Sequence, residues 1–443
     1  MISPTHITAT FEIVTPMFLG GDDQQASLIR ASAIKGALAF WWRALNFARF
    51  VDKASECQAE ALKAMQAEEQ RLFGGPKGQG VFLLKAESIP DKWTTLETGQ
   101  VLAKDGSSFS NPKRNDSRTV GVGARYLGYG ILNAFYTKGD KDKNKPKKEA
   151  GELERSCIKI SSTFILHIIP KPNCPSEDIT EILRVIKLFG LLGGLGSRVR
   201  RGWGSVVLVD LKGDRIDPFD NWKPPSTPDE YKVRLKEIIG DTLPKVPGQK
   251  FRVTAFAKES DIRVGTSPTD SALIALNALG EGLLKYRAWG KPKGKVDNIS
   301  VDASFVNDHD WFKNIDPFSQ ANVGRGDYIP ARAAFGLPHN YSKLGVTAPG
   351  DHDRRASPLM FHITKINCQY YPVAVFMPTQ FLNEEKAVVR NEQQGKKTLK
   401  NYTFDPDIIT DFLDGHPHVD GSKSNGTPKP AGNHYFPSMQ VFS

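Results

Sequence analysis

The stretch GGLGSRVRRGWGS at residues 193–205 is the most informative part of this sequence about its fold class. It follows a segment with acidic residues in its first turn and apolar residues at helical spacing, which predicts a helix over 177–192. The apolar segment behind it predicts a strand over 205–211. A dinucleotide-binding loop has the opposite order, because it follows a strand and opens a helix. The stretch contains neither GxGxxG nor the GKS or GKT ending of a P-loop, so no cofactor is expected.

Outward from this loop, the N-terminal half mixes strands and helices without a regular βαβαβ alternation. Composition and spacing predict strands over 8–14, 81–85 and 157–169 and helices over 32–50 and 55–72. The resulting order of strand, helix, strands, helix and strand is that of the split βαβ, or ferredoxin-like, plan. We therefore expect an α+β fold rather than a doubly wound sheet.

The C-terminal half is expected to repeat this plan, with a strand over 251–257, a helix over 271–287 and strands over 360–366 and 371–377. The prolines between the halves are typical of a linker. We expect two separately folded domains, at 1–215 and 251–443, joined by a proline-rich linker at 216–250. Composition also predicts a lysine-rich, solvated insertion near 138–148 and a low-complexity tail at 414–433.

Charge and cysteine content narrow the class of protein. The 59 lysines and arginines exceed the 49 acidic residues, and the formal net charge of +10 favours an anionic partner such as nucleic acid. No apolar run approaches the roughly 20 residues of a membrane helix, and the N-terminus lacks the pattern of a signal peptide. The four cysteines form no CxxC pair. We expect a cytoplasmic protein with no membrane contact, disulfide framework or zinc site.

A first candidate site lies in the helix expected over 32–50. Ser32 is expected to cap this helix, so that its N-terminus, Arg30 and Lys35 can hold a phosphate together. Trp42 and Arg43 lie about two turns further along and are assigned to the same RNA-binding surface. The alternative is that the tryptophan belongs to the core and the cations belong to an ordinary surface.

The glycine-rich loop is the second candidate site. Gly194 and Gly196 are expected to let an RNA backbone approach closely, and Trp203 is expected to stack on a base. Guanidinium groups bind phosphate and stack on bases, and the loop carries three, on Arg198, Arg200 and Arg201. The alternative is a glycine-rich helix stop beside solvated arginines. In the C-terminal half, the candidate phosphate contacts are Arg332, Arg354 and Arg355.

No catalytic or metal-binding constellation accompanies these cations in the sequence. Asp308-His309-Asp310 and Asp351-His352-Asp353 lie in polar segments, and neither GxSxG nor HExxH occurs. We therefore expect no catalytic residue, no metal and no enzymatic activity. One alternative is an RNA-processing endoribonuclease, which would need a histidine or lysine base near the glycine-rich loop. Another is a protein–protein scaffold.

Several of these segments resemble the RAMP superfamily of CRISPR proteins. The opening, IVTPMFLGG at 13–21 with IRASAIKGALAFWWR at 29–43, is most similar to first subunits of type III-B (Cmr) effector complexes. Leu72-Phe73-Gly74, the glycine-rich loop, and the C-terminal segments 332–339 and 355–359 resemble later landmarks of the family, so the resemblance covers both halves. Ala39 departs from it, because many relatives carry a basic residue there.

The resemblance implies two ferredoxin-like (RRM-like) domains in tandem. It implies a non-catalytic, RNA-binding subunit of a ribonucleoprotein that acts in antiviral defence, with target cleavage assigned to a different subunit. The implied partners are the 3′ region of a guide (CRISPR) RNA, the target RNA and the other subunits of the complex.

Overall fold

The computed structural model describes residues 6–20, 25–26, 28–54, 57–76, 78–113, 115–139, 147–213, 222–248, 251–287, 295–296, 299–300, 305, 331–340, 346–349, 354–382, 386–391, 396–416 and 437–442. Both Asp-His-Asp sequences, most of the lysine-rich insertion and most of the expected low-complexity tail lie outside these residues. Among the described residues, no helix is long and apolar enough to cross a membrane. The fold is mixed, with helices packed on antiparallel sheets.

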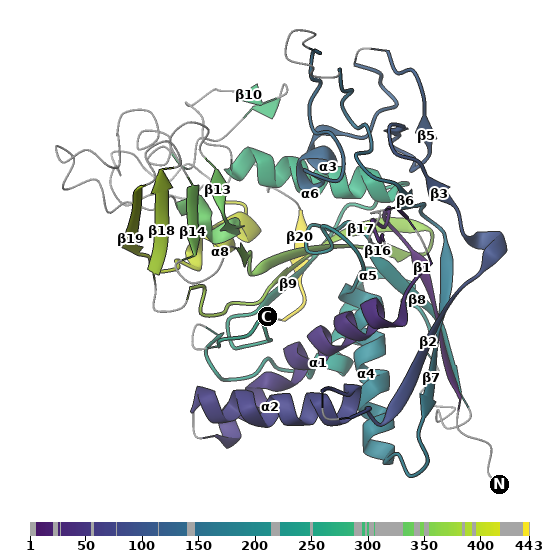
Figure 1. Ribbon diagram of the computed structural model, residues 1–443, viewed down its shortest axis with the longest axis vertical. Helices are drawn as coiled ribbons and strands as arrows, with labels where there is room; N and C mark the ends of the chain where they lie inside the picture. Colours follow the sequence, from purple (N-terminus) through teal and green to yellow (C-terminus); the bar gives the residue numbers. More distant parts are fainter. Residues whose placement is uncertain are drawn as a thin grey trace.

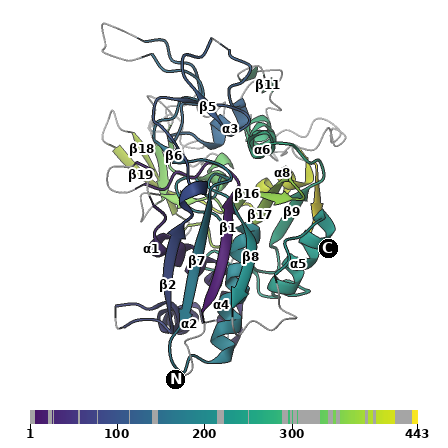
Figure 2. The same cartoon turned by 90° about the vertical axis from the view of Figure 1, so that its right-hand side faces the viewer.

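The N-terminal half is built on one four-stranded antiparallel sheet. Its order is β2-β7-β1-β8, which Figure 2 shows from one side to the other; the strands are β1 (Ile7–Ile13), β2 (Phe82–Ser88), β7 (Thr163–Pro170) and β8 (Val206–Gly213). Every second residue of β1 is buried, so one face of the sheet is turned to the core. That face is covered by α1 (Ala31–Lys53), α2 (Gln58–Phe73) and α4 (Ser176–Leu192) (Figure 1).

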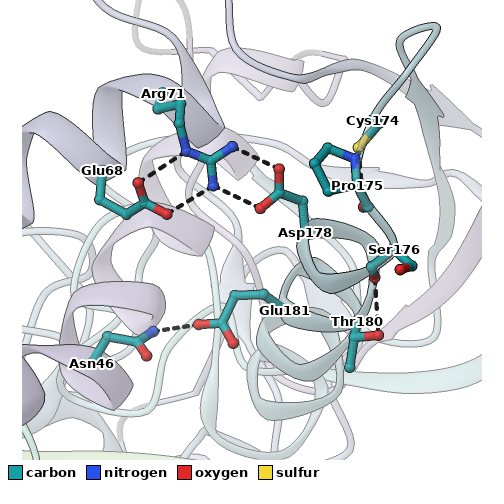
Figure 3. Close-up of polar contacts among 9 residues, drawn as sticks. All are labelled: Asn46, Glu68, Arg71, Cys174, Pro175, Ser176, Asp178, Thr180 and Glu181. Carbon is teal, nitrogen blue, oxygen red and sulfur yellow. Dashed lines mark hydrogen bonds and ion pairs between the residues drawn. The ribbon is translucent and has the colours of Figure 1, made fainter.

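Polar contacts fix these three helices to one another (Figure 3). The Arg71 guanidinium on α2 donates to both carboxylate oxygens of Asp178 on α4 at 2.6 Å, and it also binds Glu68. Asn46 on α1 donates to Glu181 on α4. The hydrogen bonds from Arg71 hold the pKa of the Glu68 carboxyl below its ordinary value. Arg71 therefore links α2 to the first turn of α4, where an acid also suits the helix dipole.

The C-terminal half is built on a second four-stranded antiparallel sheet. Its order is β16-β17-β9-β20; the strands are β9 (Asp261–Gly265), β16 (Leu359–Ile366), β17 (Gln369–Phe376) and β20 (Ser438–Gln440). Its helices are α6 (Ala272–Arg287) and α8 (Asp407–Asp414), which are joined where the Tyr286 hydroxyl donates to the Ile408 carbonyl at 2.7 Å. In both halves the first strand in sequence pairs with the third and the fourth.

Short elements complete the described part of the chain. The N-terminal half carries η1 (Pro90–Lys92), β3 (Thr95–Leu96), β4 (Val101–Leu102), β5 (Ser108–Phe109), α3 (Val122–Leu127) and β6 (Cys157–Ile158). The C-terminal half carries β10 (Lys295–Val296), β11 (Ile299–Ser300), η5 (Ala331–Phe335), β12 (Gly336–Leu337) and β15 (Arg355–Ala356). A third antiparallel sheet has the order β13-β14-β18-β19, formed by β13 (His339–Asn340), β14 (Val346–Pro349), β18 (Lys386–Asn391) and β19 (Lys396–Asn401).

The two halves share their hydrophobic cores, which differs from the expectation of separately folded domains. One core joins α1 to the C-terminal half, where the rings of Phe47 and Phe251 lie 5.1 Å apart. The other core joins Trp203 to Leu276 on α6. An ion pair of 2.7 Å between Glu12 on β1 and Lys365 on β16 also crosses the boundary. Each half therefore covers part of the apolar surface of the other.

Two expected elements between the halves are wrong. The segment 251–257 is not a strand but an irregular segment packed on α1, with the Phe256 amide donating to the Ala44 carbonyl at 2.9 Å. Its apolar residues resemble those of a buried strand, but they are apolar because they pack against a helix. The expected linker contains the helix α5 (Pro228–Ile239), whose fully buried Tyr231 donates its hydroxyl to the Leu191 carbonyl on α4.

The shared cores predict that the halves depend on each other. Residues 222–443 expressed alone should lack fixed tertiary structure, because the surfaces that pack on α1 and Trp203 would be exposed. Co-expression with residues 1–213 should restore a soluble complex of the two pieces. Co-purification and near-UV circular dichroism measure this, and cooperative unfolding of 222–443 by itself would contradict it.

The contact of α2 with α4 predicts a loss of stability in the Arg71→Met variant. The Asp178 side chain is only 9% exposed, so it would lose a bidentate partner without gaining full hydration. Because Arg71 itself is 42% exposed, the expected loss is modest, about 1 kcal/mol. The matched control is Arg234→Met on α5, whose pair with Glu237 is exposed on both sides. Urea unfolding should separate the two variants, and equal midpoints would refute the assignment.

Candidate nucleic-acid interface

The glycine-rich loop lies directly on the segment 15–18 near the N-terminus. The fully buried Thr15 hydroxyl donates to the Gly202 carbonyl at 2.7 Å and accepts from the Ser205 amide at 2.9 Å. The Gly204 amide donates to the Pro16 carbonyl at 3.1 Å, and the Ser197 amide donates to the Phe18 carbonyl at 3.0 Å. Two sequence motifs that are almost 200 positions apart therefore form one structural unit.

The loop glycines serve this close packing rather than the approach of RNA. At Gly196 (φ +91°) a Cβ atom would lie 2.6 Å from the Phe18 carbonyl oxygen, and at Gly204 (φ +66°) it would lie 2.0 Å from that of Leu195. Gly194 is buried, and a Cβ atom there would lie 2.5 Å from the Gly204 oxygen. The expected ligand-contact role of Gly194 and Gly196 is therefore corrected. Their space is filled by the protein's own backbone.

The same loop contacts the C-terminal half. The Phe361 amide on β16 donates to the Arg200 carbonyl at 3.1 Å, and the Ile363 amide donates to the Ser205 hydroxyl at 3.1 Å. Strand β16 accordingly lies beside β8, where the two sheets approach each other (Figure 1). The loop therefore sits at the junction of the two halves.

The three loop arginines have different surroundings. Arg198 is exposed and has a left-handed backbone (φ +62°), in a turn closed by the Arg201 amide donating to the Arg198 carbonyl at 2.8 Å. Arg200 is half-buried, with its guanidinium carbon 5.5 Å from the centre of the Phe40 ring on α1. Arg201 is half-buried and donates to the Phe335 carbonyl at 2.9 Å.

Other arginines gather around this loop. Arg198 is exposed overall, but partial burial of its guanidinium, and then the positive charges of Arg354 and Arg155, lower its pKa. Burial and then Arg355 lower the pKa of Arg200 to about 10. The structure thus brings together cations from the loop and from the C-terminal half, which the sequence predicted as separate sites. We call Arg155, Arg198, Arg200, Arg354 and Arg355 the arginine cluster.

The positive charges of Arg198 and Arg200, the loop members of this cluster, are not paired with acidic residues in the described part of the chain. Within the described part of the chain, neither Arg198 nor Arg200 makes an ion pair, and the side-chain Nε of Arg200 is buried without a hydrogen-bond partner. Like charges held together in a partly buried place raise the free energy of the empty site, and a bound anion lowers it. The arrangement is suited to phosphate groups.

The candidate cations of α1 are more dispersed. Arg30, not Ser32, is the N-cap residue of α1, and its exposed guanidinium donates to the Gly20 carbonyl at 2.7 Å. The Lys35 amino group lies 3.4 Å from the Gly74 carbonyl oxygen. Arg43 pairs with Glu69 at 2.6 Å, so its charge is already compensated, which weakens the prediction that it binds RNA. An anion at Arg30 and Lys35 stays a prediction.

Three predicted contacts lie inside the protein. Trp42 and Trp203 are fully buried, with edge contacts to Phe73 and Phe18 respectively, so neither ring can stack on a base in this conformation. Arg332 in η5 is also buried, at 8% exposure. These predictions are corrected. Large rings beside glycines fill the core under the loop, because their burial stabilises the fold strongly.

A histidine approaches the loop in space, although none is close to it in sequence. His362 on β16 is 2% exposed, and burial lowers its pKa to about 3, against a smaller opposing effect of a backbone hydrogen bond at Gly193. Such a ring is neutral at physiological pH and shielded from a ligand. No cluster of three or more metal-ligating side chains occurs among the described residues.

Comparison with known proteins gives the family context of this loop and sheet. Residues 10–207 match the model of the RAMP superfamily. The chain is 24% identical over 203 residues to the CRISPR system Cmr subunit Cmr1-2 of Pyrococcus furiosus. The aligned region covers 45% of this chain and 94% of that protein. The resemblance inferred from the sequence is thus confirmed as a similarity: residues 10–207 match the RAMP superfamily, and part of the chain is similar to a Cmr1 subunit.

Two solved structures also resemble this chain. The crystal structure of Cmr1 from Pyrococcus furiosus in its apo form covers 99% of this chain and is itself covered to 98%, with 17% identity and a TM-score of 0.49. A chain of the cryo-EM structure of the type III-B Cmr-beta complex bound to cognate target RNA covers 85% of this chain and is covered to 94%, with 13% identity and a TM-score of 0.45.

The buried His362 predicts a pH-dependent loss of stability. Its pKa is lower in the folded chain than in the unfolded chain, so the unfolded state takes up the proton first. His362 therefore destabilises the fold progressively as the pH falls below about 6.5 toward 3. The His362→Asn variant should lose less thermal stability than the wild type between pH 7 and pH 4.5. The exposed His416→Asn serves as control, and parallel pH profiles of all three proteins would contradict the prediction.

Proposed function

We propose that this protein is a non-catalytic RNA-binding subunit of a type III-B CRISPR ribonucleoprotein effector complex. It binds the 3′ region of the guide RNA, the target RNA or both, in antiviral defence. The arginine cluster carries the proposal, because it combines guanidinium groups from separate segments, and Arg198 and Arg200 have no balancing acid among the described residues. Four free cysteines agree with a reducing, cytoplasmic location.

The partners follow from the same reasoning. The RAMP match and the similarity to a Cmr subunit support assembly with the other subunits of such a complex. Arginine contacts to phosphates position an RNA without reading its sequence. We therefore propose that the protein recognises the RNA backbone and that base pairing between guide and target supplies the sequence specificity.

The proposed fold is two ferredoxin-like (RRM-like) domains in tandem, with limits near 1–215 and 251–443. The two sheets support this, because their orders β2-β7-β1-β8 and β16-β17-β9-β20 place the four strands of each half identically. This is the strand arrangement of the split βαβ plan. Modules of this type bind single-stranded RNA. The shared cores make the pair of domains one cooperative unit.

An RNA-processing endoribonuclease is the second candidate, and His362 is the observation that favours it. This histidine lies next to the glycine-rich loop at Gly193, where a general base would be needed. Its burial argues against that role, since a base must reach the hydroxyl that it deprotonates. Incubation of the full chain with labelled guide RNA separates the two candidates. We expect a shift in mobility without cleavage, and cleavage abolished by His362→Ala would establish the endoribonuclease.

The arginine cluster predicts a change in the salt dependence of RNA binding. Replacing Arg155, Arg198 and Arg354 with Gln removes three phosphate contacts, each worth about 0.7 in the slope of log K against log salt for single strands. The slope should flatten by about 2, and affinity should fall similarly for RNAs of unrelated sequence. Fluorescence anisotropy of the full chain at several salt concentrations measures both.

The matched control removes the same charge elsewhere, with Lys53→Gln, Lys63→Gln and Lys92→Gln at exposed positions of the N-terminal half. This control should leave the slope nearly unchanged. If both triple variants change the slope equally, RNA binding is a property of net charge rather than of the cluster, and the proposed interface is refuted.

A further inference from the structure

A tyrosine stands exposed beside the arginine cluster. Tyr129 lies in the turn after α3 and is 68% exposed, whereas most aromatic rings of the described chain are buried. A large ring in water contributes little to folding, so its position calls for another explanation. Tyr129 is not part of the candidate site that the sequence predicted.

The turn that carries Tyr129 lies against Arg198. A Cβ atom built at Gly130 would lie 3.3 Å from the Nη2 atom of Arg198, and the Tyr129 hydroxyl is near enough to affect the pKa of that guanidinium. Arg155 and Arg354 act on the same guanidinium. The exposed ring and three cations therefore belong to one patch of surface.

The turn is well anchored. The Ile131 amide donates to the Gly128 carbonyl at 2.9 Å, and Ile131 and Leu132 are buried in the core that contains Trp203. Beneath the turn, a Cβ atom at Gly128 would lie 3.0 Å from the ring of Trp203. The buried Trp203 thus supports the backbone from which Tyr129 projects. An anchored backbone presents the ring at a small cost in conformational entropy.

Helix α3 places this turn by packing on α6 of the C-terminal half. The helices approach at two glycines, since a Cβ atom at Gly280 would lie 2.0 Å from the Gly123 carbonyl oxygen. The Asn277 side chain on α6 also accepts from the Gly123 amide at 2.9 Å. The position of Tyr129 is therefore set by contacts between the halves, as is the position of the loop.

We propose that Tyr129 is the stacking platform for an unpaired base of the bound RNA, whose neighbouring phosphates are held by Arg155, Arg198 and Arg354. This inference rests on the RNA-binding function proposed above. The ligand is single-stranded RNA, because a base in a duplex has both faces covered and cannot stack on a side chain. The three arginines beside the ring favour this ligand over an apolar protein partner.

The test compares Tyr129→Ala with Tyr129→Phe in the full chain. The Ala variant should bind single-stranded RNA roughly 5- to 150-fold more weakly, the range of one lost base stack, with an unchanged salt slope. The Phe variant keeps the ring and should bind like the wild type. Duplex RNA of the same length should bind both variants equally. Fluorescence anisotropy gives the affinities, and thermal unfolding confirms that each variant is folded.

The matched control is Tyr136→Ala, at another exposed tyrosine, 42% exposed, whose ring lies 5.8 Å from the Lys147 amino group. It should leave the affinity unchanged. Unaltered affinity in Tyr129→Ala, while the Arg155, Arg198 and Arg354 variant binds weakly, overturns the stacking role and leaves the proposed function standing. Equal losses in Ala and Phe, or equal losses on duplex and single strand, also overturn it. Unaltered binding in both the tyrosine and the arginine variants refutes the proposed function itself.

Discussion

The hydroxyl of Thr15 donates to the Gly202 carbonyl and accepts from the Ser205 amide. The conformation of the glycine-rich loop on the N-terminal segment depends on these two buried hydrogen bonds. Buried polar groups that are fully paired fix a structure strongly, because any other arrangement leaves one of them unpaired. The bonds hold the glycine-rich loop in its tight form on the N-terminal segment. The Ser205 hydroxyl then accepts from Ile363 on β16, so the same loop joins the second sheet to the first.

The position of the charges follows from this anchored backbone. The loop carries Arg198 and Arg200 to a place near Arg354 and Arg355, at the start of β15, and near Arg155, just before β6. Partial burial and the neighbouring positive charges lower the pKa of Arg198 and Arg200, so folding alone does not stabilise the cluster. Clustered cations raise the electrostatic free energy of the isolated chain, and a bound anion lowers it. Such a surface is typical of a binding site.

The aromatic residues near the candidate site fall into two groups, those buried in the core and those exposed to solvent. Trp42 and Trp203 have the composition expected of base-stacking residues, but each fills a core beneath the surface. Trp203 belongs to the core shared by the halves, and the turn above it exposes Tyr129 instead. The same packing that joins the cores of the two halves therefore also determines which ring is presented to solvent.

The sequence by itself determined the local structure and the cationic character of this protein. The helices α1, α2, α4 and α6 and the strands β2, β8, β16 and β17 lie within a few residues of their predicted ranges, since apolar periodicity reports which face of an element is buried. The irregular 251–257 segment escaped prediction because burial against α1 outweighs local propensity there. Helix α5 escaped prediction because the prolines around it suggested a linker, although Thr227 caps it and Pro228 opens it. Only the tertiary structure decided which arginines meet, which of the loop glycines contact backbone, and that Arg155 and Tyr129 join the site. Those choices depend on contacts between segments far apart in the chain, and local sequence carries no record of them.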